Sequence, residues 1–239
     1  MNTIKDNGFL ADLHTHILPE IDDGPQTVEE SIAILKEEAK QGITHIALTP
    51  HFSLSDVSVE EFLNQRELSF GKMMAEVDKN PDLAAIKFHL GAEVSYNPNL
   101  IYEDVAKLCI GDTSYILLEL LGSYPFNIEK TVSWMVAQGI TPIIAHAERY
   151  GYLMSNLSML DSLIDAGAII QCNAESVLSI FRFGRIKRLI RDGYVHLIAS
   201  DTHNLDKRPP SLNDAYDKLK KLSDPLINNA ERVIDNAFI

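Results

Sequence analysis

The sequence has little cysteine, no long apolar run and no excess of positive charge, and each absence excludes a class of protein. Its 239 residues include two cysteines, Cys109 and Cys172, so no disulfide framework of the secreted type is expected. No stretch approaches the ~18 apolar residues of a membrane span, and residues 1–7 lack the apolar core of a signal peptide. We therefore expect a cytoplasmic protein that does not insert into a membrane.

The formal net charge of −13 excludes a general nucleic-acid binder, which needs a positive surface for phosphates. One predicted helix departs from this balance. Its basic residues are Arg182, Arg185, Lys187, Arg188 and Arg191. This basic face is either a solvated helix surface or a docking site for an acidic or phosphorylated partner.

The chain also lacks a linker rich in glycine, proline or serine. With 46% hydrophobic residues it can form a sizeable core, and an α/β barrel commonly reaches this length as one domain. We therefore expect a single domain over residues 1–239.

Short apolar runs alternate with amphipathic segments. The predicted strands are 9–13, 45–49, 86–91, 115–120, 141–145, 168–172 and 195–199, and the predicted helices are 28–41, 59–78, 128–138, 157–165, 177–191 and 212–222. From residue 119 onward the strand ends, at 119, 146, 173 and 201, recur every 27, 27 and 28 residues, the length of one βα unit. Seven alternating strands predict a distorted seven-stranded parallel β/α barrel. An open doubly wound sheet is the alternative.

Ligand-type side chains recur where the predicted strands end. The first strand runs into His14-Thr15-His16, and residues i and i+2 of a strand point to the same face, so both imidazoles can reach one ion. The full set of candidate metal ligands is His14, His16, His51, Glu93, Glu119, His146, Asp201 and His203. His45, His89 and His196 fall at the start or middle of strands, and we interpret them as structural.

Any one of these side chains alone is better explained as a hydrogen-bonded structural residue. Eight together overfill one four- or six-coordinate ion, so two or three ions with bridging carboxylates are expected. Imidazole with carboxylate suits Mn, Fe or Zn in an open catalytic site. Closely spaced ions hold a hydroxide as nucleophile, which predicts a hydrolase.

Two arginines point to a phosphate substrate. Arg149 lies three residues after one predicted histidine ligand and Arg208 five residues after another, so both should lie on loops over the same site. One guanidinium group can bind a phosphate through two parallel N–H···O hydrogen bonds. The alternative for each arginine is a surface salt bridge.

Two further features bear on the chemistry. Asp22, in the turn 22–25, either shapes that turn or adds a ligand. A cysteine-based phosphatase is excluded, because such enzymes need an arginine six positions beyond the nucleophile, where this chain has Tyr115 and Leu178. We therefore interpret both cysteines as core residues.

From about residue 9 to 222 the chain resembles the PHP (polymerase and histidinol phosphatase) family, and within it the CpsB/CapC/YwqE type of bacterial tyrosine-protein phosphatase. Besides the eight candidate ligands, the motifs that carry the resemblance are Asp22-Asp23-Gly24-Pro25, Glu29-Glu30-Ser31, Gly91-Ala92-Glu93, Ile144-Ala145-His146-Ala147-Glu148-Arg149-Tyr150, Ala199-Ser200-Asp201-Thr202-His203-Asn204-Leu205 and Arg208-Pro209-Pro210.

The resemblance implies a distorted seven-stranded barrel with a trinuclear site, usually holding Mn²⁺, with Fe or Zn as alternatives. It implies hydrolysis of phosphotyrosine on a bacterial tyrosine kinase that controls capsule or exopolysaccharide synthesis. The eight ligands carry over position by position, and Arg149 and Arg208 match arginines near the family's active site. The wider family often has a histidine where this chain has Asp22.

Three other functions stay open at this point. The same metals could act on a small phosphate ester such as histidinol phosphate. An amidohydrolase would share the early His-x-His but has no use for Arg149 and Arg208, and often needs a lysine at a strand end, which is missing here. A metal-stabilised accessory module would be non-enzymatic, and retention of all eight ligands disfavours it.

Overall fold

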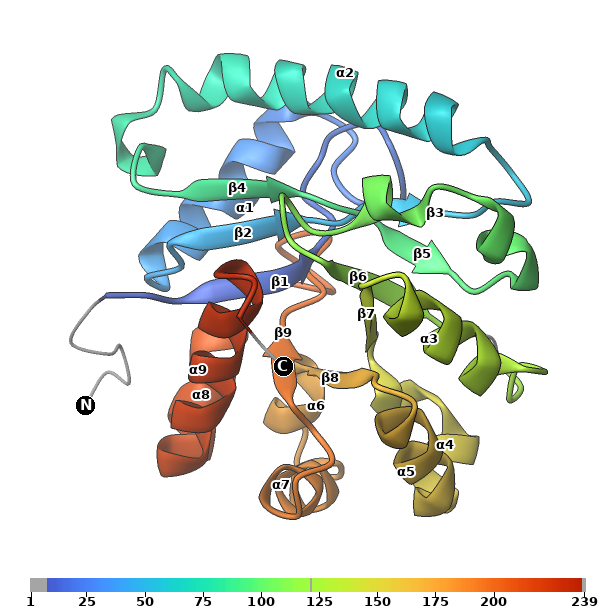
Figure 1. The fold of residues 1–239 in the computed structure, drawn as a ribbon. Coiled ribbons are helices and arrows are strands. Elements are labelled where there is room, and N and C mark those ends of the chain that lie inside the picture. The colour runs from blue at the N-terminus through green and yellow to red at the C-terminus, as the bar shows by residue number, and fades with distance from the viewer. Residues whose placement is uncertain (1–7, 121, 238–239) are drawn as a thin grey trace.

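Parallel strands and helices alternate along the chain in the computed structural model (Figure 1), which describes residues 8–120 and 122–237. The strands of this part are β1 (Ala11–Thr15), β2 (His45–Leu48), β3 (His51–Phe52), β4 (Lys87–Leu90), β5 (Glu93–Ser95), β6 (Tyr115–Glu119), β7 (Thr141–Ile144), β8 (Ile169–Asn173) and β9 (Leu197–Ala199). Its α-helices are α1 (Val28–Lys40), α2 (Val59–Val77), α3 (Ile128–Ala137), α4 (Gly151–Ser155), α5 (Leu157–Asp165), α6 (Ala174–Leu178), α7 (Phe183–Arg191), α8 (Leu212–Leu219) and α9 (Ser223–Ile234). The short 3-10 helices are η1 (Pro81–Leu83), η2 (Pro98–Tyr102), η3 (Val105–Leu108), η4 (Ala147–Arg149) and η5 (Lys220–Leu222).

The strands pair in parallel throughout, in the orders β1-β2-β4 and β3-β5-β6-β7-β8-β9, and the helices lie around them (Figure 1). Both faces of the strands are buried. Leu117 contributes to an apolar cluster on one face, while its neighbours Ile116 and Leu118 join the cluster on the other. This two-sided burial explains the nearly continuous apolar runs of the sequence. The prediction of an α/β fold with parallel strands is confirmed.

The predicted count of seven strands is not confirmed, because two predicted strands are each interrupted. The run 45–49 continues beyond a break at Pro50 as β3, and the run 86–91 continues beyond a break at Gly91 as β5. Proline has no N–H to donate to a neighbouring strand. Across the two breaks, Gly91 N–H donates to the Leu48 carbonyl at 2.9 Å and Glu93 N–H to the Pro50 carbonyl at 3.0 Å.

The first and last strands lie side by side at their carboxyl ends. Thr15 and Thr202 form an isolated parallel bridge, in which His16 N–H donates to the Thr202 carbonyl at 2.8 Å. Asp201 N–H donates to the His14 carbonyl at 2.9 Å. This contact joins the two ends of the strand order, but a continuous β1–β9 ladder, and with it closure of the barrel, is not confirmed.

Most predicted helices form where their caps indicate. Thr27 caps α1, its hydroxyl accepting from Glu30 N–H at 3.2 Å, and α2 begins at Val59 behind the cap Ser58. Helix α5 spans the predicted residues 157–165. Helix α9 was not predicted. Among the described residues no helix has the length and apolar character needed to cross a membrane.

The prediction of one helix over 177–191 is wrong. The chain forms α6, then an open turn, and only then α7. Ser179 leaves the helical conformation (φ −62°, ψ 128°), and its hydroxyl accepts from Arg182 N–H at 3.4 Å. Serine commonly bonds nearby backbone in this way at helix ends. The break exposes Ile180 and Phe181 in the turn.

Candidate metal centre

The eight side chains predicted as ligands meet at the carboxyl ends of the strands. His14 lies in β1 and His16 follows it; His51, Glu93 and Glu119 lie in β3, β5 and β6, and the remaining three follow β7 and β9. Parallel pairing aligns these ends, so residues far apart in sequence become neighbours. The structure thus brings the whole predicted set together at one site, which is buried at His14 and His16 and open to solvent at His51 and Glu119.

The innermost group pairs two histidines with two carboxylates. The Nε2 atoms of His14 and His16 lie 3.2 Å apart. Glu93 Oε2 is 3.4 Å and 3.2 Å from these two nitrogens, and Asp201 Oδ1 is 3.5 Å and 3.6 Å from them. All four side chains are buried. Four donor atoms therefore converge on one point that solvent does not reach.

Two further groups lie beside the first and share members with it. One combines His16, Asp23, His51 and His203, and the other His51, Glu93 and Glu119; within each group one ligand atom per residue lies within 4.8 Å of the others. His146 Nε2 completes the set, 2.7 Å from Glu93 Oε1 and 3.7 Å from Glu119 Oε1. Shared residues suit adjacent ions with bridging ligands.

Asp22 and Asp23 have different roles, and sequence reasoning considered only Asp22 as a ligand. Asp22 accepts a hydrogen bond from His16 Nδ1 at 2.7 Å and another from the backbone N–H of His51 at 3.1 Å, so it orients its neighbours. Asp23 instead places Oδ1 at 3.1 Å from His203 Nε2 and 3.4 Å from His51 Nε2. Asp23 is therefore the additional ligand-type residue.

Gly24 explains how this turn approaches the histidines so closely. A Cβ atom at position 24 would lie 2.4 Å from the carbonyl oxygen of His16, a distance that no side chain tolerates. Only glycine lets the backbone pass there. The turn 22–25 is thereby held against the end of β1, with both aspartates in reach of the histidines.

The electrostatics of the inner group favour a cation. Burial lowers the pKa of His16, but hydrogen bonds to Asp22 and Glu93 outweigh it and raise that pKa to about 10. Burial raises the pKa of Glu93, but the neighbouring His14 and His146 outweigh burial and hold that pKa well below its usual range. The carboxylates thus keep positive charge in the site even without a metal.

The donor set also has two buried atoms whose contacts lack good hydrogen-bond geometry. Within residues 8–120 and 122–237, these are Glu93 Oε2, 2.9 Å from His51 Nδ1, and His203 Nε2, 3.1 Å from Asp23 Oδ1. A buried polar atom without a partner costs free energy. A bound cation would take the place of the Nε2 proton of His16; with the Nδ1 proton donated to Asp22, Nε2 would then offer its lone pair beside His14 and Glu93. Residues of this kind fit a metal ion among them.

The buried side-chain amides of Gln171 and Asn173 hold the inner ligands in place through hydrogen bonds. The Gln171 Oε1 atom accepts from His146 N–H at 2.7 Å and lies 3.4 Å from His14 Nδ1. Gln171 Nε2 donates to Asn173 Oδ1 at 2.9 Å, and Asn173 Nδ2 donates to Asp201 Oδ2 at 2.7 Å.

This chain of bonds assigns the protons. A backbone N–H can only donate, so Gln171 presents its oxygen to both His146 and His14. The Nδ1 of His14 must then carry the proton, which leaves its Nε2 lone pair for the site. Asn173 likewise occupies one oxygen of Asp201 and leaves Oδ1 facing the histidines. Sequence reasoning missed both amides as supporting residues: Gln171 lies inside a predicted strand, and Asn173, although it marks a predicted strand end, is not a metal-ligand residue type.

Each predicted arginine contacts a ligand carboxylate. Arg149 Nη2 lies 2.5 Å from Asp201 Oδ2, and Arg208 Nη2 lies 2.5 Å from Asp23 Oδ2. Both side chains are about one-third exposed, at 39% and 31%. They line one cavity of about 120 Å³ together with Lys207. The same cavity is lined by Asp201, one of the metal-type residues.

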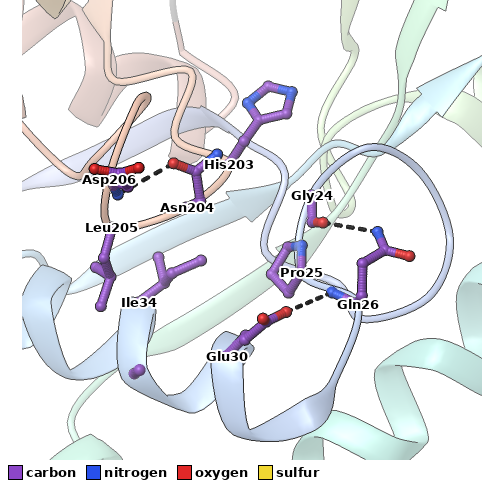
Figure 2. A pocket seen from close by; sticks show the side chains of 10 residues that line it. Gly24, Pro25, Gln26, Glu30, Ile34, His203, Asn204, Leu205 and Asp206 are labelled. Atoms are coloured by element: carbon purple, nitrogen blue, oxygen red, sulfur yellow. Dashed lines mark hydrogen bonds between the residues drawn. The ribbon is translucent and has the colours of Figure 1, made fainter.

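A larger cavity of about 480 Å³ adjoins the site on the other side (Figure 2). Pro25, Ile34 and Leu205 give it apolar walls, while the imidazole of His203 turns away from Ile34 and Leu205. Gln26 closes one edge by donating from its amide to the Gly24 carbonyl at 2.9 Å. The cavity has room for an apolar group of a ligand held beside His203.

The residues interpreted as structural lie outside these groups. His45 and His89 stack with ring centroids 5.6 Å apart, and His196 Nδ1 accepts from Ile170 N–H at 3.1 Å. Cys109 and Cys172 are free thiols in the core, and burial raises the pKa of Cys109 to about 12. A thiol of that pKa is a poor nucleophile near neutral pH.

Comparison with known proteins gives one consistent result. The family model described as capsular polysaccharide synthesis, CpsB/CapC, matches residues 10–236. The tyrosine-protein phosphatase CpsB of Streptococcus pneumoniae is 32% identical over 96% of this chain and all of that protein. The tyrosine-protein phosphatase YwqE of Bacillus subtilis is 31% identical over 96% of this chain and 93% of YwqE.

A solved structure gives the same match. It is one of the crystal structures described as YwqE from Bacillus subtilis and CpsB from Streptococcus pneumoniae, metal-dependent tyrosine phosphatases. This structure superimposes with a TM-score of 0.83 at 27% sequence identity, and the match covers 96% of each chain. The similarity therefore extends over the strands, the helices and the whole ligand-bearing edge.

Proposed function

Because the chain belongs to the CpsB/CapC family, we propose that it is a metal-dependent protein-tyrosine phosphatase. The single observation that carries the proposal is the arrangement of three interlocking histidine–carboxylate groups with Arg149 and Arg208, each arginine bonded to a ligand-type aspartate. This arrangement combines metal-type donors with phosphate-type donors in one opening. Its substrates would be phosphotyrosine proteins, with a bacterial tyrosine kinase of capsule or exopolysaccharide synthesis as the expected partner.

The residues that would hold the ions are the eight predicted ligands together with Asp23. We propose two or three ions; imidazole with carboxylate oxygen suits Mn, Fe or Zn, and we favour Mn²⁺ because of the resemblance to the manganese-dependent phosphatases of this family. When bound, the ions would neutralise negative charge on the phosphate and lower the pKa of water at the site. Glu93 Oε2 and His203 Nε2, which are buried without a well-formed hydrogen bond among the described residues, support this use of the residues.

Arg149 and Arg208 would orient the phosphate. Each guanidinium is anchored by one N–H group to a carboxylate, which leaves its other N–H groups to donate to phosphoryl oxygens. Burial lowers the pKa of Arg149 but Asp201 outweighs it and raises that pKa, so the group stays charged throughout. The leaving phenol has a pKa near 10, so it departs with less proton donation than an alkyl alcohol needs.

A polypeptide substrate is favoured by exposed apolar side chains in three segments that follow strands of the sheet. Tyr102, Phe126 and Phe181 are 80%, 86% and 91% exposed and lie in the segments that follow β5, β6 and β8. Large apolar side chains that are this exposed are candidates for contact with a partner. A small phosphate ester of the histidinol-phosphate type is the runner-up, and it has no use for these side chains.

We also propose that residues 1–239 form one domain whose strands make a distorted seven-stranded barrel. Counting β2 with β3 and β4 with β5 as single interrupted strands gives seven, and the Thr15–Thr202 bridge supports closure between β1 and β9. The free thiols Cys109 and Cys172 support a reducing compartment, and we assign the enzyme to the cytoplasm.

The test combines elemental analysis of the purified protein with assays on a phosphotyrosine peptide and on histidinol phosphate, each with Mn, Fe, Zn or Mg. We expect at least two ions per chain and faster hydrolysis of the peptide with Mn. Faster hydrolysis of histidinol phosphate would select the runner-up. Fewer than two ions per chain, with no hydrolysis of either ester, would instead support the accessory module.

A further inference from the structure

The turn between α6 and α7 presents two apolar and two basic side chains to solvent. Ile180 and Phe181 are 82% and 91% exposed, and Arg182 and Arg185 are exposed beside them. We name these four residues the turn patch. Large apolar side chains scattered singly are ordinary on a surface, but two adjacent ones next to two arginines are typical of a binding surface.

The two arginines of the turn patch differ from the two at the other end of α7. Arg188 Nε and Arg191 Nε bond to the carboxylate of Asp192 at 3.2 Å and 3.3 Å. Within residues 8–120 and 122–237, Arg182 and Arg185 form no ion pair with a carboxylate, and Arg182 donates to the Ser176 hydroxyl at 3.3 Å. Their positive charge is therefore available to a partner.

The turn patch is connected to the metal centre through one short chain of bonds. Ser176, which accepts from Arg182, donates its hydroxyl to Glu148 Oε1 at 3.0 Å. Glu148 directly precedes Arg149 in η4. A cavity of about 270 Å³ lies between these parts, lined by Glu148, Met154, Phe181, Arg182, Arg185 and Ile186. A polypeptide that reaches Arg149 can therefore continue over the turn patch.

The direction of α7 separates its two pairs of arginines. Helix α6 follows β8 directly at the carboxyl edge of the strands, and α7 then leads back to the start of β9. The turn patch thus lies at the end of α7 that faces the site, while Arg188 and Arg191 lie toward the opposite edge. This difference provides a matched control within one helix.

Charge identifies the partner. The chain carries a formal net charge of −13, so an acidic polypeptide is repelled by most of its surface and attracted where cations are unpaired. We propose that the turn patch binds an acidic segment next to the phosphotyrosine of the substrate, with its carboxylates on Arg182 and Arg185 and an apolar side chain on Phe181. This inference rests on the proposed phosphatase function and adds the sequence class of its substrate.

The test compares three substrates: a phosphotyrosine peptide with flanking Asp and Glu, the same peptide with Asn and Gln in their place, and p-nitrophenyl phosphate. The variants are R182A/R185A and, as the matched control, R188A/R191A. Because exposed charge pairs contribute ~0.2–1 kcal/mol each, we expect KM for the acidic peptide to rise about 3- to 10-fold in R182A/R185A. Its kcat, and all constants for the other two substrates, should stay within twofold of wild type.

Folding is controlled by R185A alone, since Arg185 makes no ion pair that its loss would break, and by thermal unfolding of every variant. If wild type prefers neither peptide and R182A/R185A leaves KM unchanged, the turn patch is not a docking site while the phosphatase function stands. If wild type hydrolyses neither peptide, both proposals are overturned. If R182A/R185A instead loses binding to phosphatidylglycerol vesicles without a change in peptide KM, the patch serves a membrane surface and the docking proposal is overturned.

Discussion

Two pairs of histidines lie on the three paired strands β1, β2 and β4 and differ in their surroundings. At the carboxyl ends, His14 and His16 face each other across 3.2 Å with Glu93 and Asp201 beside them. At the starts of β2 and within β4, His45 and His89 stack with ring centroids 5.6 Å apart and Lys87 nearby. Both arrangements bring two imidazoles into contact inside the fold.

The neighbours decide what each pair does. Burial lowers the pKa of His16, but the hydrogen-bonded Asp22 and Glu93 raise it to about 10. Burial together with His89 and Lys87 lowers the pKa of His45 to about 4. The carboxylates around His14 and His16 therefore attract cations. His45 is uncharged near neutral pH and packs against His89. A pair of histidines predicts a metal site only where carboxylates accompany it.

The largest expected effect comes from removing the imidazoles of the first pair. In H14A/H16A we expect loss of bound metal and a fall of about 10³-fold or more in kcat/KM for a phosphotyrosine peptide, because the charge neutralisation by the ions is lost. The matched double variant H45Q/H89Q should keep its metal content, measured by elemental analysis, and stay within about threefold of wild type. Equal losses in both variants would mean that the two pairs do not differ as described.

The next effect concerns the amides that orient the first pair. Gln171→Leu frees His14 Nδ1 and His146 N–H, and Asn173→Leu frees one oxygen of Asp201. Loss of such supporting bonds weakens metal binding by about 10- to 100-fold, which titration calorimetry with Mn²⁺ would measure. Asn229→Leu is the control, because its amide donates to the His196 carbonyl at the other end of the strands. An unchanged Mn²⁺ affinity in Q171L and N173L would show that the two amides do not support metal binding.

A smaller effect is expected from changing the arginines while keeping their charge. Arg149→Lys and Arg208→Lys retain a cation next to Asp201 and Asp23 but lose the paired N–H groups. We expect kcat/KM to fall about 10-fold in each variant with an unchanged number of bound ions. Steady-state kinetics and elemental analysis on the same samples check this. A loss of metal in either variant would show that the arginine supports the ligands instead of the phosphate.

The smallest effect is a dependence of stability on pH from the second pair. The pKa of His45 is about 4 in the fold against 6.5 when unfolded, so the unfolded chain binds more protons between these values. Its contribution is present above about pH 6.5 and is lost as the pH falls toward 4. Since His45 is half-buried, we expect ~1 kcal/mol, or 2–4 °C in Tm.

The measurement is thermal unfolding at pH 7 and pH 5 in the presence of EDTA, for wild type and His45→Gln. The wild-type Tm should fall more between these pH values than the Tm of H45Q. A steeper fall in H45Q would reverse the sign assigned to His45.

The sequence predicted those features that depend on local pattern. Strands buried on both faces read as apolar runs, and the polar residue that ends each run marks the carboxyl edge, which is why His51, Glu93 and Glu119 could be selected together. Thr27 and Ser58 likewise revealed the starts of α1 and α2 through their caps.

Features that depend on tertiary contacts could not be predicted. Asp22 and Asp23 are adjacent, and only the turn pressed onto His16 by Gly24 shows which one orients and which one joins the donors. Gln171 reads as an ordinary strand residue and Asn173 only as the end of a strand until β8 is placed beside β7 and β9. The break before α7 follows from a serine whose local bonding competes with the helix.

The contact between the first and last strands has a consequence for the order of events during synthesis. Asp12 accepts a hydrogen bond from Ser200 N–H, 188 residues later in the chain, and the inner donors come from both sides of that contact. Such a long loop closes late in folding. A nascent chain that ends before Asp201 and His203 therefore lacks two of the eight predicted ligands, and we expect the complete donor set to form only once nearly the whole polypeptide has been synthesised.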